Sequence, residues 1–161
     1  MSRRFTHIVL LCYPEYGAID VGGESGEQPP RTFEGFVAEG EEILSIKCAQ
    51  DGLAQVQLTL EEWAGVPDGE PPSWPEWEAE SRHEIDIDEY VTVAPAGTQA
   101  PDLHGLRLHG GSRRFNVRIL AQGRTEIRQR ISELARQGQL ERAEEFDGIE
   151  RYLLQIWPAN K

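Results

Sequence analysis

The chain has 161 residues, of which 39% are hydrophobic and 27% charged, a composition that indicates one folded domain spanning residues 1–161 rather than a disordered tail. Its 28 acidic residues against 16 Lys and Arg give a formal net charge of −12, which is the wrong sign for direct binding to nucleic acid or to an anionic membrane. The longest apolar run is too short to cross a bilayer, a secretory signal is not evident, and two cysteines do not make a disulfide framework, so we expect a cytoplasmic protein.

The first half of the chain predicts strands, because apolar residues alternate with polar ones over short stretches. Residues 6–13 form a dense apolar run, which is typical of a central strand. Residues 43–48 predict a mostly buried strand and residues 54–60 a half-buried one. Asp51-Gly52 lies between these two runs and favours a hairpin turn.

The second half of the chain continues this strand pattern. The strictly alternating stretch Glu84–Asp88 predicts a strand whose Asp86 and Asp88 side chains share one face, and we expect it to run on through Val91 and Val93. Further strands are predicted over residues 103–108, over residues 114–121, and over the second dense apolar run, residues 151–157.

One segment has helical spacing. Ile127, Ile131 and Leu134 follow one another at i, i+4 and i+7, Thr125 is a plausible N-cap, and Gly138 suits the C-terminal stop. Many short strands, one short helix and Pro/Gly-rich loops indicate a mainly β fold. We predict an antiparallel β-sandwich of about 7–8 strands with one short α-helix near the C-terminus. Helices do not alternate with the strands, which disfavours a parallel sheet.

Charge is distributed in blocks along the chain. The net charge is −7 over residues 15–42 and −10 over residues 61–90, whereas residues 103–130 carry seven arginines and have a net charge of +6. Such blocks either orient an approaching partner or form a solvated rim that keeps the protein soluble. The arginines also have a third use, which is to pair with the acidic loops of the same molecule.

Motifs that would indicate an enzyme are missing from the sequence. No Cys-x-x-Cys, zinc-helix or Gly-x-Ser-x-Gly pattern occurs, and Cys12 and Cys48 lie in apolar strand patterns that predict burial. His83 and the acids that follow it offer ligands to a hard cation, but the oxygen cage of a calcium loop is missing. We therefore predict a protein that is not an enzyme and that has no cofactor and no metal site.

Tryptophans and carboxylates concentrate in one acidic region. Residues 65–77 carry four prolines and predict an irregular loop, and three of the four tryptophans lie in this loop or just before it. These rings either fold the loop back onto the sandwich or stay exposed as anchors for a partner. Exposed indoles beside rows of carboxylates would fit the basic cleft of another macromolecule. The candidate partner-binding residues are Glu62, Trp63, Trp74, Glu76, Trp77, Glu78, Glu80, Asp86 and Asp88.

The order of the predicted elements resembles a known family. A strand at residues 7–13, strands at 41–48 and 54–60 around Asp51-Gly52, and later strands at 114–121 and 150–158 resemble the ComJ-like nuclease-inhibitor family and the immunity-type β-sandwich proteins around it. This resemblance implies an inhibitor that binds and silences a basic partner, such as a nuclease or a toxin, without being an enzyme itself.

Other interpretations of the same surface stay open. A general protein-interaction adaptor would use the sandwich for a different partner, and a small-molecule or carbohydrate binder would line an apolar groove with its tryptophans. Arg118 and its neighbours form the alternative binding face, which would suit an acidic partner. The sequence leaves the identity of the partner and the oligomeric state open.

Overall fold

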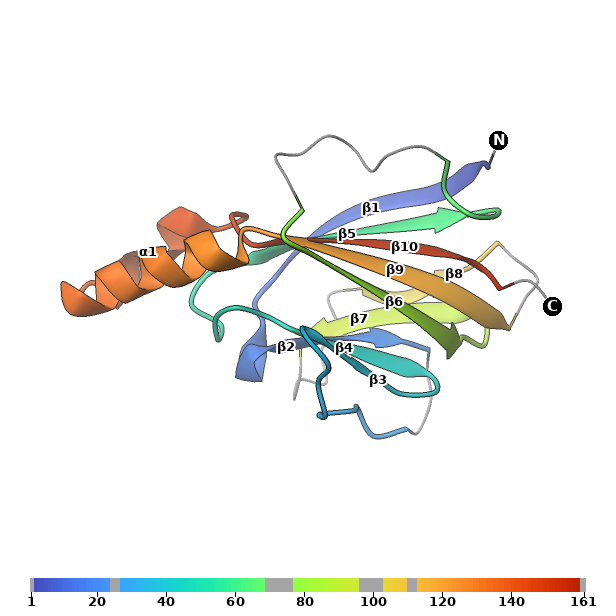
Figure 1. The fold of residues 1–161 in the computed structure, drawn as a ribbon, viewed down its shortest axis with the longest axis horizontal. Coiled ribbons are helices and arrows are strands. Elements are labelled where there is room, and N and C mark those ends of the chain that lie inside the picture. Colours follow the sequence, from blue (N-terminus) through green and yellow to red (C-terminus); the bar gives the residue numbers. More distant parts are fainter. Residues whose placement is uncertain (1, 24–26, 69–76, 96–102, 110–112, 160–161) are drawn as a thin grey trace.

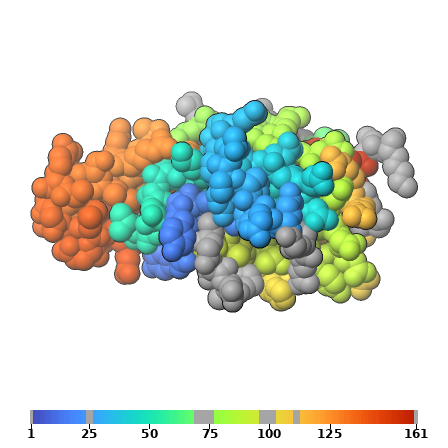
Figure 2. Space-filling model, turned by 90° about the horizontal axis from the view of Figure 1, so that it is seen from below, coloured from blue at the N-terminus to red at the C-terminus, as the bar shows by residue number. Residues whose placement is uncertain are grey.

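The computed structural model describes residues 2–23, 27–68, 77–95, 103–109 and 113–159. Over these residues the chain forms two five-stranded sheets that pack against each other (Figure 1). A helical segment projects from one end of the molecule (Figures 1 and 2). The elements are β1 (Arg4–Cys12), η1 (Glu15–Gly17), β2 (Ala18–Gly22), β3 (Val37–Glu39), β4 (Ile43–Lys47), β5 (Val56–Trp63), β6 (Ala79–Asp86), β7 (Tyr90–Pro95), β8 (Leu103–Arg107), β9 (Arg114–Gln122), α1 (Arg124–Arg136), η2 (Leu140–Phe146) and β10 (Arg151–Pro158), where η marks a 3₁₀ helix.

The first sheet has the strand order β1-β5-β10-β9-β6, and the second has the order β3-β4-β2-β7-β8. Among the strands that the structure describes, all pairs are antiparallel except one: β10 lies between β9, to which it runs antiparallel, and β5, to which it runs parallel. The prediction of a mainly β fold is confirmed, and its strands form two sheets of five. The wholly antiparallel arrangement and the count of 7–8 strands are wrong, since the described residues hold ten strands and one parallel pair.

The core lies between the two sheets and follows the period of two that the sequence shows. Along β5, Val56, Leu58 and Leu60 are fully buried at every second position. Ile46 of β4 and Val93 of β7 enter the same hydrophobic cluster from the second sheet. Burial of these alternating apolar side chains is the main favourable contribution to folding.

Three sequence predictions about the strands need correction. The Asp51-Gly52 turn is not a hairpin, because β4 and β5 belong to different sheets and the chain crosses between them at this point. Residues 84–93 are not one strand, because β6 ends at Asp86 and β7 belongs to the other sheet; Glu89 between them has a φ of 83°. The run at residues 6–13 is not central, since β1 is an edge strand, whereas β10 is central as predicted.

Two strands and two 3₁₀ helices were not predicted. Strands β2 and β3 both lie in the acidic segment 15–42, where charged residues hide the apolar pattern. Helix α1 is confirmed, although its N-cap position is Gly123, with φ 76°, rather than Thr125. Gly138 follows the helix with φ 65°, as its predicted role requires. Across the described residues, no helix has the length and apolar character that spanning a membrane demands.

Candidate functional site

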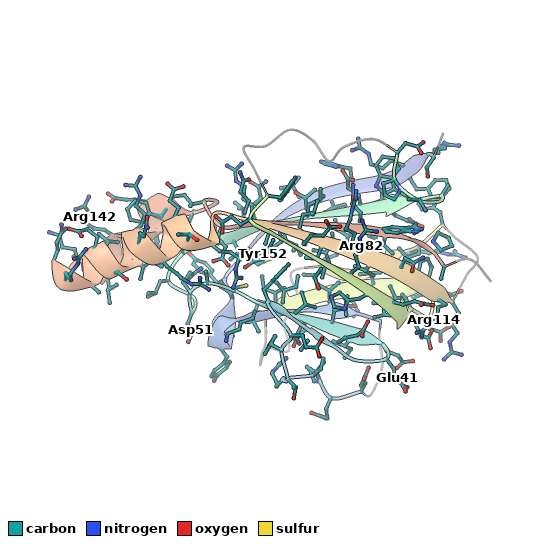
Figure 3. All side chains as sticks on the ribbon, viewed as in Figure 1. Glu41, Asp51, Arg82, Arg114, Arg142 and Tyr152 are labelled. Carbon is teal, nitrogen blue, oxygen red and sulfur yellow. The ribbon has the colours of Figure 1, made fainter. Side chains whose placement is uncertain are left out.

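An acidic hollow of about 750 Å³ lies where the edge strands of the two sheets meet. Residues Glu27, Glu39, Gly40, Glu41, Glu84, Asp86 and Arg114 line it, which gives five carboxylates and one guanidinium, or a net charge of −4. Glu41 and Arg114 lie at the end of the molecule away from Arg142 (Figure 3). We call this set of seven residues the acidic cleft.

One side of the acidic cleft is the turn between β3 and β4, which is held by the Glu27 carboxylate. Its two oxygens accept hydrogen bonds from the backbone N–H of Glu41 at 3.0 Å and of Glu42 at 2.8 Å. Gly40 suits this turn, since a Cβ there would lie 2.9 Å from the Ile43 carbonyl oxygen and 2.6 Å from the Glu27 Oε1 atom. The turn therefore holds Glu41 at the rim while the Glu27 carboxylate is occupied by backbone donors.

The other side of the acidic cleft is the end of β6, where Arg114 organises two carboxylates. The Arg114 Nε atom donates to Glu84 at 2.8 Å and its Nη1 atom donates to Asp86 at 3.0 Å. These hydrogen bonds raise the pKa of the Arg114 guanidinium above its ordinary value. Period-two alternation places Glu84 and Asp86 on the same face of β6, so one arginine from the neighbouring strand β9 reaches both.

Contacts between the sheets join the two sides of the cleft. The Glu39 Oε1 atom accepts a hydrogen bond from the Glu84 backbone N–H at 3.2 Å and lies 3.3 Å from the His83 Nδ1 atom. The Asp86 backbone N–H donates to the Glu41 carbonyl at 2.8 Å. The carboxylates of the cleft are therefore fixed on a braced backbone, even though the Glu39 and Glu84 side chains are about half exposed.

Two of the sequence candidates, Glu62 and Trp63, lie at the end of β5 and are held by contacts within the molecule. Glu62 is buried, with 1% exposure, and accepts hydrogen bonds from the His109 backbone N–H and Nδ1. The Trp63 Nε1–H donates to Glu61 at 2.9 Å, and the guanidinium of Arg4 lies over its ring. The Glu62 carboxylate therefore faces inward and is engaged by His109 rather than by solvent.

The remaining candidates are spread along and beyond β6. Glu78 caps helix α1, because its carboxylate accepts hydrogen bonds from the backbone N–H of Gly123 at 3.0 Å and of Thr125 at 3.3 Å. Glu80 is paired with Arg82 at 2.9 Å. Asp88 is exposed but follows the end of β6, so it does not share a strand face with Asp86. Trp77 is half-buried, while Trp74 and Glu76 fall outside the described residues.

The sequence candidates therefore do not form one surface. Asp86 belongs to the acidic cleft, whereas Glu80 lies at the other end of β6, about 20 Å away along the strand. Glu27, Glu39 and Glu41 were missed as site residues, although they belong to the acidic block at residues 15–42. The charge blocks in the sequence mark the acidic segments that supply these residues. That the segments lie side by side depends on contacts between the two sheets, which the charge pattern does not show.

The arginine block is divided among several places. Arg113 and Arg114 face carboxylates near the acidic cleft, with Arg113 3.9 Å from Glu42. Arg118 donates to the amide oxygen of Gln155 on the outer face of the first sheet. Arg124 is nearly buried beside Glu150 at the end where the helix begins. These arginines pair within the molecule rather than forming a single basic face.

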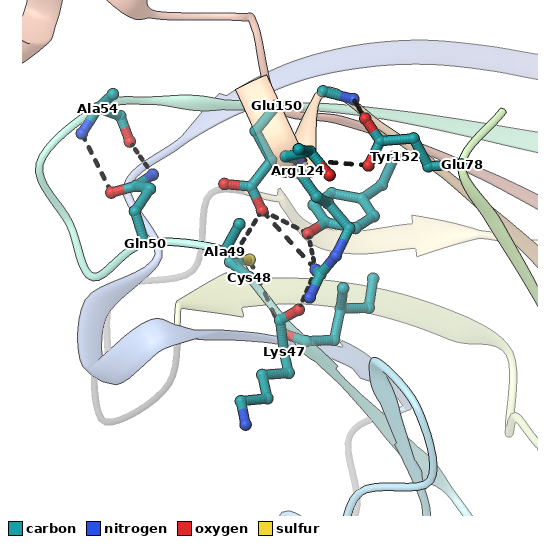
Figure 4. A network of polar contacts seen from close by, with 12 residues as sticks. Lys47, Cys48, Ala49, Gln50, Ala54, Glu78, Arg124, Glu150 and Tyr152 are labelled. Atoms are coloured by element: carbon teal, nitrogen blue, oxygen red, sulfur yellow. Dashed lines mark hydrogen bonds and ion pairs between the residues drawn. The ribbon is translucent and has the colours of Figure 1, made fainter. Parts of the chain in front are cut away.

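A second hollow, of about 310 Å³, lies near η1 and the end of β4, and Lys47, Cys48 and Ala49 are among the residues that line it. The same segment takes part in a buried polar network (Figure 4). The Glu150 carboxylate is fully buried and accepts hydrogen bonds from the Ala49 backbone N–H at 2.7 Å and from the Tyr152 hydroxyl. Arg124 donates to the Tyr152 hydroxyl at 2.6 Å and to the Lys47 carbonyl. Burial, together with the nearby Glu150 charge, raises the pKa of the Cys48 thiol well above its ordinary value. This network joins β4 of the second sheet to β10 and α1.

The acidic cleft offers charge and hydrogen-bond acceptors to a cationic ligand. Among the described residues, no group of three or more His, Cys, Asp or Glu side chains is placed to hold a metal ion. Lys and Arg side chains of a macromolecular partner are the groups that such fixed, half-exposed carboxylates complement.

Neither a family model nor a curated protein sequence matches this chain. Two solved structures share its fold. ComJ from Bacillus subtilis, an inhibitor of the DNA-degrading activity of NucA, superposes with a TM-score of 0.58 over 99% of both chains, at 7% sequence identity. The product of crocagin biosynthetic gene J superposes with a TM-score of 0.56 over 97% of this chain and 100% of its own, at 10% identity. These two likenesses establish the fold, and they agree with the resemblance that the order of the predicted strands suggested.

Proposed function

We propose that this chain is a non-enzymatic acidic binding protein that inhibits a nuclease by covering the basic cleft of that enzyme. The observation that carries the proposal is the likeness to ComJ, because it extends over 99% of both chains and includes the two-sheet arrangement as a whole. At 7% identity no contact residue is transferred from ComJ, so the binding surface is argued from this chain alone.

The acidic cleft supplies the surface. A nuclease holds the phosphates of its substrate with cationic groups, and a fixed set of carboxylates competes for the same groups. Arg114 keeps Glu84 and Asp86 in place and leaves Glu39 and Glu41 to meet the cations of the partner. Preorganisation of this kind reduces the cost of ordering side chains on binding.

Some of the other candidate residues from the sequence remain proposed contacts of the partner, and others do not. Asp88, Glu80 and Trp77 remain proposed contacts of the partner; Glu80 and Trp77 lie toward the other end of β6 from the acidic cleft, where Trp77 would be the aromatic anchor that sets residence time. Glu62 is left out, since it is buried, and Glu78 is already engaged as a helix cap. With two cysteines in 161 residues, we propose that the encounter takes place in a cytoplasmic, reducing compartment.

The proposal is tested by charge reversal at the cleft. The purified protein is immobilised, a nuclease is captured from native lysate at low and moderate salt, and inhibition of its cleavage of double-stranded DNA is measured. Glu41→Lys should raise the inhibition constant about tenfold or more, because it places a cation opposite the cations of the partner. Glu41 suits this test because it is exposed and lies at the cleft rim.

Glu141→Lys is the matched control, since Glu141 is an exposed glutamate of η2 at the end of the molecule that carries α1. It changes the net charge by the same amount, and inhibition should stay close to that of the wild type. Equal weakening by both variants would show that total charge, rather than the cleft, sets affinity. A protein that captures and inhibits no nuclease would overturn the proposed function itself.

A further inference from the structure

Strand β1 has the composition of a central strand but occupies the edge of the first sheet. Its residues His7-Ile8-Val9-Leu10-Leu11-Cys12 form a nearly continuous apolar run like that of β10. Strand β10 has a neighbour on each side, whereas β5 is the one strand neighbour of β1 among the described residues (Figure 1). An edge strand of this kind presents unpaired backbone groups that favour association with another strand.

The outer face of β1 is exposed where that of its neighbours is covered. Val9 is 51% and Leu11 52% exposed, and Tyr13 just after the strand is 38% exposed. In the same row across the sheet, Thr59 of β5 is 6% and Leu153 of β10 is 3% exposed. Apolar side chains on this outer face therefore reach solvent at β1, and adjacent exposed apolar groups of this kind mark an interaction surface.

The two ends of β1 carry opposite charge. Arg3 and Arg4 stand at its start, and residues 1–14 contain no acid in a chain that has 28. At the other end Glu15 follows the strand, and the raised pKa of the Tyr13 phenol reflects partial desolvation followed by the nearby charges of Glu144 and Asp147. A basic partner would therefore meet its own sign at the start of β1.

We propose that β1 of a second copy of the chain pairs antiparallel with β1 across a two-fold axis near Val9. The sheet that contains β1 in one copy then continues into the same sheet of the other copy. Antiparallel pairing places the basic end of each strand against the acidic end of the other, and it does so twice because the interface is symmetric. With Val9 at the axis, Thr6 lies opposite Cys12 and His7 lies opposite Leu11, which brings Arg3 before the strand of one copy toward Glu15 after the strand of the other. This surface is separate from the acidic cleft, so the inference goes beyond the proposed function.

The first test measures mass by sedimentation equilibrium on the full chain at micromolar concentration. The wild type should be a dimer, and Val9→Lys should raise its dissociation constant about tenfold or more, because two lysines would meet at the axis. Val66→Lys is the matched control, since Val66 is also an exposed valine, at 61%, and lies in the segment after β5; it should remain dimeric. A monomeric wild type, or equal loss of dimer in both variants, would overturn the inference.

A charge swap tests the orientation and does not depend on whether Val9→Lys folds. Arg3→Glu alone and Glu15→Arg alone each place like charges opposite one another and should weaken the dimer. The double variant Arg3→Glu/Glu15→Arg restores opposite charges and should recover most of the lost affinity. Additive weakening in the double variant would contradict the antiparallel arrangement. The monomeric Val9→Lys variant should still inhibit the captured nuclease, because the acidic cleft is separate from β1. Failure of the dimer proposal is therefore distinguishable from failure of the proposed function.

Discussion

Glu61 and Glu150 are both buried carboxylates, yet their surroundings shift their pKa values in opposite directions. Burial acts to raise the pKa of Glu61, but hydrogen bonds from Gln155, Trp63, His7 and Arg4 outweigh it, and the pKa is lowered. For Glu150 burial is the larger effect, and the hydrogen bonds from Tyr152 and the Ala49 backbone only partly offset it, so the pKa is raised. The number of donors around each carboxylate determines the outcome.

These two shifts predict opposite dependences of folding stability on pH. The contribution of Glu61 is present above its ordinary pKa of 4.5 and is lost as pH falls through its lowered folded pKa. Glu150 binds its proton more tightly when folded, so its effect is to decrease the free energy of unfolding as pH rises from 4.5 through its raised folded pKa. Urea unfolding over a series of pH values, with Glu61→Gln and Glu150→Gln, separates the two effects. Glu61→Gln should reduce the loss of unfolding free energy as pH falls below 4.5, and Glu150→Gln should remove the decrease in unfolding free energy as pH rises from 4.5. Identical pH profiles for the two variants would contradict this account.

Helix α1 shows how far local sequence signals determine an element. Its apolar spacing and the glycine after its last turn predict the helix from neighbouring residues alone, and both are confirmed. Strands β1 and β10 show the limit, because two similar apolar runs occupy an edge and a centre. The difference is set by which strands pair, and those pairings join residues far apart in the chain. The Asp51-Gly52 turn was misinterpreted for the same reason.

The two glycines that flank α1 give a matched prediction. Both have positive φ, but a Cβ on Gly123 would lie 1.9 Å from the Ile149 carbonyl oxygen, whereas a Cβ on Gly138 would have no atom within 4 Å. Gly138→Ala should therefore cost about 1–2 kcal/mol of unfolding free energy from the left-handed backbone alone. Gly123→Ala adds the steric overlap and should cost about 3 kcal/mol or more, measured by urea denaturation. Equal losses of unfolding free energy in the two variants would show that the backbone at Ile149 shifts far enough to relieve the overlap.

At the scale of the whole molecule, the charge blocks acquire meaning only through the fold. The acidic segments 15–42 and 61–90 meet at the acidic cleft, and the arginine block is divided among several places. The sequence identified Asp86 of the cleft, and the charge count marked the segments that supply the rest. Glu39 and Glu84 became neighbours through a contact between edge strands of different sheets, which a single sequence does not reveal.

The net charge of −12 predicts how complex formation should depend on salt. In the proposed complex, attraction between this acidic chain and a basic nuclease would raise the association rate at low ionic strength, and screening would reduce it. With the captured nuclease in stopped-flow mixing, the association rate should fall about tenfold or more between low and high salt, while the dissociation rate changes less. An association rate that does not respond to salt would rule out electrostatic steering.

The place of β10 also bears on how the protein is made. Strands β5 and β9, which flank it in the first sheet, both precede it in the chain, with α1 and η2 in between. During synthesis on the ribosome, at about 5–20 residues per second, β5 and β9 therefore each lack their neighbour β10 until residues 151–158 have emerged. During that interval the nascent chain offers two apolar strand edges, which are the features that chaperones bind.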